Sequence, residues 1–237
     1  MSKASAASEL ERLRVELGPE IFAAHYQQAP IRPGGGMIQR AWIPRYERLP
    51  APGPSTRILQ SWDTASMQGE QNDWSVCTTW MIHEKKYYLV HVLRCRFDYP
   101  TLKAQVIAHA SAHKPHAILV ENAGVGTALI AELRNAGLSA VAVKPEHNKV
   151  VRMSIQAAKF ASGRVLFPLQ ALWLAVLEAE LFAFPHGPHD DQVDSIAQAL
   201  AYEPPAYDLD VIGNGLSRML TELWWQDQWA RYIRSSF

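Results

Sequence analysis

The stretch "PHDDQVDS", residues 188–195, places three carboxylates within five positions, directly ahead of the apolar run "IAQALAY". One aspartate could cap a helix that begins here, and the helix dipole favours acids in the first turn. A cap needs only one carboxylate, however, and three adjacent carboxylates repel each other unless a cation lies among them. Asp190, Asp191 and Asp194 are therefore candidate ligands for a hard divalent cation, Mg²⁺ or Mn²⁺.

Two further acids lie where predicted strands end. Asp63 stands in "SWDTA" near the end of the first strand, and Glu121 follows Ile118, Leu119 and Val120 in "ILVEN". A carboxylate in such a position costs free energy unless it is paired or holds a cation. If the two strands are neighbours, these acids meet, and the helix that starts at "DDQVD" closes over them as a carboxylate cage. Asp73, in "NDWSV", could support the same site through water.

The overall composition limits the possible functions. The 23 basic residues equal the 23 acidic residues, which argues against a surface coated for phosphate binding. No run of about eighteen apolar residues indicates a membrane span, and the N-terminus lacks the apolar centre of a signal peptide. The cysteines Cys77 and Cys95 lie on strands of one predicted hairpin. Its register would pair Cys77 with Val92 and Cys95 with Trp74, so we expect a reducing compartment and no disulfide.

The composition also divides the chain into three parts. Residues 1–56 have a helical pattern followed by a Pro- and Gly-rich segment, 29–56, that is typical of an extended linker rather than a packed element. Residues 57–203 form the predicted globular domain. The tail, 204–237, is rich in aromatic residues, is predicted to be helical, and contains Trp224, Trp225 and Trp229.

The order of the predicted elements indicates an α/β fold. Three strands with short connections predict an antiparallel meander, and helices then alternate with strands that suit a buried sheet. The strands are expected at 57–65, 75–83, 86–96, 116–122, 138–145 and 164–168. The helices are expected at 99–114, 124–137, 148–163, 169–184 and from about 190. This order resembles the ribonuclease H-like fold, a mixed sheet flanked by helices in which the first and fourth strands are neighbours.

Several motifs together resemble one family. The segments "SWDTA", "NDWSV", "ILVENAGVGTALIAEL", "GRVLFP" and "PHDDQVDSIAQAL" resemble the nuclease domain of the large terminase subunit of tailed bacteriophages. The upstream "LGPEIFAAHYQQAPIRPGGGMIQRAW" resembles the segment that joins the ATPase domain of that family to its nuclease, so the resemblance covers roughly residues 15–203. It implies that Asp63, Glu121 and Asp191 bind metal, with Asp190 and Asp194 as alternatives for the last position.

The resemblance implies a metal-dependent endonuclease that cuts double-stranded viral DNA during genome packaging. Two metal ions about 4 Å apart would be bridged by one carboxylate, with Asp63 as the candidate for that position. The chain has no G-x-x-x-x-G-K-[ST] motif, so an ATPase is not expected within it. The implied partners are double-stranded DNA, a portal, a small terminase subunit and a terminase ATPase domain, in the cytoplasm of an infected or prophage-carrying bacterium; no membrane is involved.

Other functions and other interpretations of the motifs are compatible with the sequence. A junction resolvase or transposase would use similar acids, and a non-catalytic DNA-binding or assembly module would need none of them. A nucleotide-binding domain of the actin and sugar-kinase type would need a glycine-rich loop where this chain has only Gly69. Lys144, Lys149 and Arg152 would contact DNA phosphates or simply form the solvent face of a helix.

Two loops also admit two interpretations. The glycines of "ENAGVGTAL" would cradle a phosphate or allow close packing of a strand and a helix. His186 and His189 in "HGPHDD" would bind metal or lie in a solvated loop, and the second interpretation is favoured.

Overall fold

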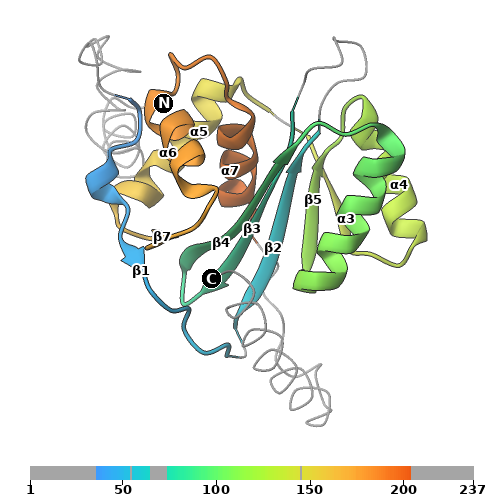
Figure 1. Ribbon diagram of the computed structural model, residues 1–237, viewed down its shortest axis with the longest axis horizontal. Coiled ribbons are helices and arrows are strands. Elements are labelled where there is room, and N and C mark those ends of the chain that lie inside the picture. Colours follow the sequence, from blue (N-terminus) through green and yellow to red (C-terminus); the bar gives the residue numbers. More distant parts are fainter. Residues whose placement is uncertain (1–35, 54, 65–73, 145, 204–237) are drawn as a thin grey trace, which may run out of the picture.

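The computed structural model describes residues 36–53, 55–64, 74–144 and 146–203. Within this part, a seven-stranded sheet has the order β1-β7-β4-β3-β2-β5-β6. Figure 1 shows α3 (Tyr99–His113) and α4 (Val125–Asn135) on one face of the sheet. The other face is covered by α5 (Lys149–Ala161), α6 (Leu174–Ala183) and α7 (Asp191–Ala201). The predicted α/β sandwich is confirmed, although α6 begins five residues later than its apolar pattern suggested.

The strand pairing brings two strand ends to the same edge. The strands β2 (Arg57–Asp63), β3 (Ser75–His83) and β4 (Lys86–Cys95) form the antiparallel meander. The strand β5 (Ala117–Glu121) runs parallel to β2 and is its direct neighbour, as predicted. The strand β6 (Ala140–Val143) continues the parallel part beyond β5. On the other side of the meander, β7 (Val165–Pro168) runs parallel to β4.

A bulge in the hairpin of β3 and β4 corrects the predicted register. Near the turn the pairing follows the prediction, with Trp80 opposite Leu89, but Thr79 lies opposite His91. Beyond this extra residue the register is shifted by one position, so that Cys77 pairs with Leu93 instead of Val92. A single-residue bulge is not visible in a hydrophobic pattern, because it adds one apolar residue to an apolar run. Both cysteines are free, as expected.

The described part of the predicted linker is packed, so that expectation was wrong. Met37, Ile38 and Ile43 are buried in the main core. A short 3-10 helix (Arg40–Trp42) leads into β1 (Arg45–Tyr46), which pairs in parallel with β7. The many prolines and glycines of this segment predicted an extended chain, and the chain is indeed extended. Its apolar side chains nevertheless find the edge of the sheet and the surface of α6.

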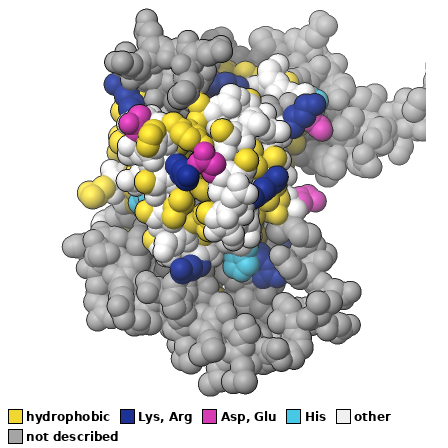
Figure 2. All heavy atoms as spheres, turned by 90° about the vertical axis from the view of Figure 1, so that its right-hand side faces the viewer, with side chains coloured by type: hydrophobic (Ala, Val, Ile, Leu, Met, Phe, Trp, Pro, Cys, Tyr) yellow, Lys and Arg dark blue, Asp and Glu magenta, His cyan; other side chains and the backbone are white. Residues whose placement is uncertain are grey.

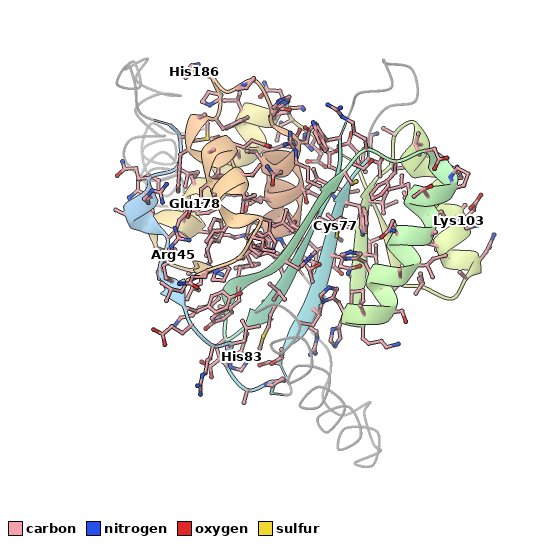
Figure 3. All side chains as sticks on the ribbon, viewed as in Figure 1. Arg45, Cys77, His83, Lys103, Glu178 and His186 are labelled. Carbon is pink, nitrogen blue, oxygen red and sulfur yellow. The ribbon has the colours of Figure 1, made fainter. Side chains whose placement is uncertain are left out.

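Charged residues attach the same segment to α6. The carboxylate of Glu178 accepts hydrogen bonds from Arg40 Nη1 at 2.6 Å and from Arg45 Nη2. Figure 3 shows Arg45 and Glu178 facing one another from β1 and α6. These two arginines are therefore engaged within the protein, and they are not part of a free basic surface.

The core has two layers, one on each face of the sheet. The larger layer joins the sheet to α5, α6 and α7, and every residue of α7 from Gln192 to Leu200 is buried. The smaller layer joins β2, β3 and β5 to α3 and α4, and Trp62 is fully buried in it. The central helix α7 is thus fixed over the sheet by packing along its whole length.

Gly126 allows α4 to start against the end of β5. A Cβ added at this position would lie 2.0 Å from the carbonyl oxygen of Glu121, well inside contact distance. Gly124, which precedes the helix, has a φ of +52°. These observations support close strand–helix packing as the reason for the glycines in "ENAGVGTAL", in preference to a phosphate cradle.

We expect Gly126→Ala to lower the free energy of unfolding by about 3 kcal/mol, because α4 must move away from β5. The thermal midpoint should fall by roughly 10 °C. Gly137→Ala is the control, since nothing lies within 4 Å of its added Cβ and only its φ of +77° opposes the change. Equal midpoints for Gly126→Ala and the parent in a thermal melt would contradict this packing argument.

Three predictions fall outside the described residues: the N-terminal helix of residues 1–25, the side chain of Asp73 and the Trp-rich tail. The division into 1–56, 57–203 and 204–237 therefore stays a prediction. Within the described part, no helix combines the length and apolar character needed to cross a bilayer.

Candidate active site

Asp63 and Glu121 lie at the carboxyl ends of adjacent parallel strands. Trp62 of β2 pairs with Val120 of β5, so the acids that follow them occupy the same edge of the sheet. Side chains alternate along β2, and Leu59 belongs to the core layer beneath α7. Asp63, four residues later, therefore faces α7 as well. The sequence prediction that these two acids approach each other agrees with this register.

Polar contacts hold α7 over this edge. Ser195 Oγ donates to the carbonyl oxygen of Ser61 at 2.8 Å and lies 2.8 Å from Thr78 Oγ1. One turn later, Gln198 Nε2 donates to Ser61 Oγ at 3.0 Å. All of these groups are buried. Because α7 is fastened to β2 just before Asp63, its N-terminal aspartates must lie beside that residue.

The start of α7 is capped from another helix. Glu180 of α6 accepts hydrogen bonds from the backbone N–H of Gln192 at 2.6 Å and from its side-chain Nε2 at 2.6 Å. Asp190 occupies the N-cap position but makes no side-chain capping bond. The simplest explanation of the aspartate cluster, helix capping, therefore does not account for it.

Crowding of acids perturbs their ionisation. Burial, followed by the charge of Asp194, raises the pKa of Asp63 to about 8, and Asp191 and Glu121 add to the effect. Burial also raises the pKa of Asp191 and of Asp194. The charge of Asp190 acts on Asp191 and on Asp194, and its side chain is 38% exposed. The structure thus brings Asp63, Glu121, Asp191 and Asp194 together, with Asp190 at the rim.

Two cations of α5 lie within the acid cluster. Lys149 Nζ is 2.7 Å from Asp190 Oδ1 and 2.7 Å from Asp194 Oδ2. Burial opposes the charge of Lys149, but the bonds to Asp190 and Asp194 raise the pKa of its ammonium. A cation in the first turn of a helix opposes the helix dipole, so the neighbouring acids must compensate for it.

Arg152 lies one turn further along α5. Its guanidinium is 2.8 Å from Asp194 Oδ1 and 3.5 Å from Glu121 Oε2. Lys149 and Arg152 are therefore ion-paired with the predicted metal ligands and do not form a separate solvent-facing row. Lys144, the third predicted DNA contact, is exposed.

Arg94 is a site residue that the sequence reasoning missed. Asp63 pairs with Val76, and Val76 pairs with Arg94, so the three residues form one row across β2, β3 and β4. Arg94 Nη2 is 3.8 Å from both Asp191 Oδ2 and Glu180 Oε2, and its guanidinium lies over the ring of Trp74. The sequence does contain a sign of this role. Arg94 is a charged residue at a position of β4 that faces the core, two residues after buried Val92.

The donor set suits a hard divalent cation. Carboxylates from β2, β5 and α7 converge, and burial together with the charges of Asp194, Asp191 and Glu121 raises the pKa of Asp63 although Lys149 lies beside the cluster. Oxygen-only ligation of this kind favours Mg²⁺ or Mn²⁺ over softer metals. His186 and His189 are both exposed in the loop ahead of α7, which agrees with the solvated-loop interpretation.

The ion pair of Arg152 with Asp194 should stabilise the fold, because the two side chains are only 17% and 6% exposed. We expect Arg152→Met to lower the free energy of unfolding by about 2 kcal/mol in chelator, since Asp194 keeps Lys149 but loses its other partner. Added Mg²⁺ should restore part of the loss. Denaturant melts would measure both values.

Lys103→Met is the matched control for this change. It removes a 2.7 Å ion pair with Glu132 in which both side chains are 39% exposed. Such a pair contributes little, so the expected loss is much smaller than the loss caused by Arg152→Met. Equal losses for the two variants would show that the buried pair has no special role.

Comparisons with known proteins agree with this architecture. The large terminase nuclease from thermophilic phage G20c with bound zinc is 20% identical and has a TM-score of 0.52, over 70% of this chain and 95% of that one. The same nuclease with bound magnesium gives a TM-score of 0.51, with 20% identity over 70% and 94% of the two chains. The large terminase of another thermophilic bacteriophage gives 0.56 at 14% identity, over 84% of this chain and 52% of that one. No curated protein matches this chain.

Structures at these identities establish the shared fold, which is the predicted ribonuclease H-like one. The family model is more specific. The model described as "Terminase RNaseH-like domain" matches residues 60–203, about three fifths of the chain, and this range contains Asp63, Glu121 and the aspartates of α7. The chain therefore belongs to the terminase RNaseH-like domain family.

Proposed function

We propose that this chain hydrolyses phosphodiester bonds of double-stranded DNA with divalent cations held by Asp63, Glu121, Asp191 and Asp194. The observation that carries the proposal is the convergence of these acids at one sheet edge, where burial and mutual repulsion raise the pKa of Asp63 to about 8. Burial and repulsion within this cluster disfavour ionised Asp63 in the metal-free fold, and a bound cation would offset that cost. The structures of the G20c nuclease with bound zinc and with bound magnesium support the proposal that this site binds divalent cations.

The chemistry divides between the cations and the chain. When bound, the cations lower the pKa of a bound water and stabilise the charge that develops on the phosphate. Asp63, on which the charges of Asp194, Asp191 and Glu121 act, would hold the cations together with those acids. Lys149 and Arg152 partly balance the charge of the acids, and their position beside the cluster would suit them to contact a DNA phosphate.

The biological setting is part of the same proposal. The partners are double-stranded viral DNA, a portal, a small terminase subunit and a terminase ATPase domain, in the cytoplasm of the bacterial host. The second phage's large terminase, which was also solved in complex with ATP-gamma-S, supports an associated ATPase, and this chain spans 52% of it. We also propose that residues 57–203 form the nuclease domain and that residues 1–56 form the connection to the ATPase.

Plasmid cleavage tests this function. The purified chain should nick and then linearise supercoiled plasmid in Mg²⁺ or Mn²⁺, with little sequence preference, and should be inactive in excess chelator. Activity should return when Mg²⁺ is restored. Full cleavage in chelator would contradict a metal-dependent mechanism, and preference for a branched junction over plain duplex would favour a resolvase.

Weak DNA binding is a further expectation. The chain has no net charge, and five basic residues of its described part are engaged with Glu178 or with the acid cluster. Figure 2 faces α3 and α4 and shows acidic and basic side chains scattered among apolar ones, without a basic patch among the described residues of this face. We expect the dissociation constant for random duplex to lie near the weak end of the ~10⁻⁴ to 10⁻⁶ M range at physiological salt.

Fluorescence anisotropy with Ca²⁺ in place of Mg²⁺ measures this constant without cleavage. Binding should weaken steeply as salt rises, because few contacts hold the duplex. A nanomolar dissociation constant at physiological salt would overturn this expectation and would point to a stand-alone nuclease.

A further inference from the structure

We propose that His91, His109 and His113 form a second metal site, for Zn²⁺, on the face of the sheet opposite the acid cluster. One ring nitrogen of each histidine lies within 4.8 Å of those of the other two. His91 belongs to β4, and the other two belong to α3. A bound ion would therefore fasten α3 to the sheet. This proposal does not depend on the proposed nuclease function.

The backbone explains why the three rings meet. His109 and His113 are four residues apart on α3, so their side chains project from successive turns of the same helix face. His91 lies opposite Thr79 and not Trp80, because of the bulge in the hairpin. Side chains of β3 alternate, and Cys77, two residues from Thr79, belongs to the core layer beneath α3. The bulge therefore turns His91 toward α3.

The ring positions approach the geometry that zinc requires. The ring centroids of His91 and His109 are 5.3 Å apart, those of His91 and His113 are 5.7 Å apart, and those of His109 and His113 are 5.6 Å apart. A tetrahedral ion with Zn–N bonds of about 2.0–2.1 Å needs ring nitrogens roughly 3.4 Å apart. Binding of an ion therefore requires the ring nitrogens, which now lie within 4.8 Å of one another, to move closer together, and the fourth position remains for water or another ligand.

The chemistry of the cluster suits a borderline metal. Burial, with mutual repulsion of the rings, lowers the pKa of His91 to about 4 and that of His113 to about 3, and burial lowers the pKa of His109. A neutral imidazole offers a nitrogen lone pair to a metal, and three of them favour Zn²⁺ over Mg²⁺. His109 Nδ1 is buried and has no hydrogen-bond partner among the described residues. A bound metal ion would give this nitrogen a partner, and so would a neighbouring side chain that turned to form a hydrogen bond with it.

Aromatic side chains complete the surroundings. The Trp62 ring stands edge-on to His109 at 6.0 Å, and the Trp173 ring stands edge-on to His91 at 6.4 Å. An apolar wall around nitrogen ligands limits access of water and strengthens metal binding. The acid cluster cannot share this ion, because Asp63 faces α7 on the other side of the sheet.

Calorimetric titration with Zn²⁺ tests the site. The full chain, without an affinity tag and stripped of metal, carries Asp63→Asn and Asp191→Asn so that the acid cluster cannot compete. In millimolar Mg²⁺ we expect one Zn²⁺ to bind per chain. His109→Gln or His113→Gln in this background should weaken binding by about 100-fold or more, since a direct ligand is lost. His83→Gln is the control, because that ring contacts Thr56 and Glu84 away from the cluster, and it should leave binding unchanged.

Two further measurements test the site without the histidine variants, in case one of these variants folds poorly. Zn²⁺ should raise the thermal midpoint of the background protein. Anomalous diffraction at the zinc edge should show an ion between α3 and β4. Absence of zinc from the background protein, or equal affinity in the His109→Gln and His83→Gln variants, would overturn the site.

Discussion

Replacing Asp63 with Asn is expected to reduce Mg²⁺-dependent DNA cleavage by on the order of 10³-fold or more. A metal-binding carboxylate supports several kcal/mol of transition-state stabilisation, and ~4 kcal/mol corresponds to about 10³-fold in rate. Asp63 is the acid on which the charges of Asp194, Asp191 and Glu121 all act, so it holds the central position in the cluster. Initial rates of plasmid nicking by the parent and the variant would measure the effect.

The fold should survive this change. Asn has nearly the shape of Asp, and removal of one carboxylate relieves repulsion within the metal-free cluster. The thermal midpoint in chelator should therefore be equal to that of the parent or slightly higher. Glu132→Gln on α4 is the control, because it removes an exposed carboxylate remote from the cluster and should leave cleavage unchanged. Parent-like cleavage by Asp63→Asn would remove Asp63 from the active site.

The three aspartates of "PHDDQVDS" should differ sharply in their effects. We expect Asp191→Asn and Asp194→Asn each to reduce cleavage by about 100-fold or more, because both acids interact electrostatically with Asp63. Asp190→Asn should change the rate by less than about fivefold. Its side chain is 38% exposed and contacts Lys149 at the rim of the cluster.

The same plasmid assay, at saturating Mg²⁺, ranks the three variants. Circular dichroism of Asp194→Asn is a necessary control, because this change also leaves Arg152 without its shortest ion pair. A rate for Asp190→Asn as low as that for Asp194→Asn would contradict the assignment of Asp190 to the rim.

The sequence was sufficient to predict the sheet order around the acids. Asp63 and Glu121 each end a predicted strand, and the arrangement of strands and helices specifies that these strands become neighbours. The acidic start of α7 could be assigned to the same site because three carboxylates exceed the needs of a cap. Such patterns predict the fold well because the burial of apolar side chains is the dominant favourable term in the free energy of folding.

Other parts of the site could not be predicted, because they depend on contacts between distant segments. Lys149 and Arg152 were predicted to contact DNA phosphates or to form the solvent face of a helix, and only the packing of α5 against α7 brings them to Asp194. The cap supplied by Glu180 to Gln192 joins two helices through one carboxylate. Neither contact leaves a periodic signal along the chain.

The bulge at Thr79 is a similar case with a larger consequence. One extra apolar residue in β4 cannot be detected from the alternation of apolar and polar residues. It nevertheless changes which side chains beyond the bulge face the helices on each side of the sheet. Arg94 consequently lies in the row of Asp63, and His91 faces α3. The buried part of the linker was missed for a different reason, since prolines and glycines predict an extended chain whether or not it packs.

Anomalous diffraction from crystals grown with Mn²⁺ and a short DNA duplex tests the central claim most directly. The DNA phosphate should complete the coordination, because an acid cluster alone repels itself and binds cations weakly. We expect two adjacent manganese peaks beside Asp63, with Glu121, Asp191 and Asp194 as the remaining protein ligands. Manganese bound elsewhere, with no peak beside Asp63 at saturating Mn²⁺, would contradict the proposed active site.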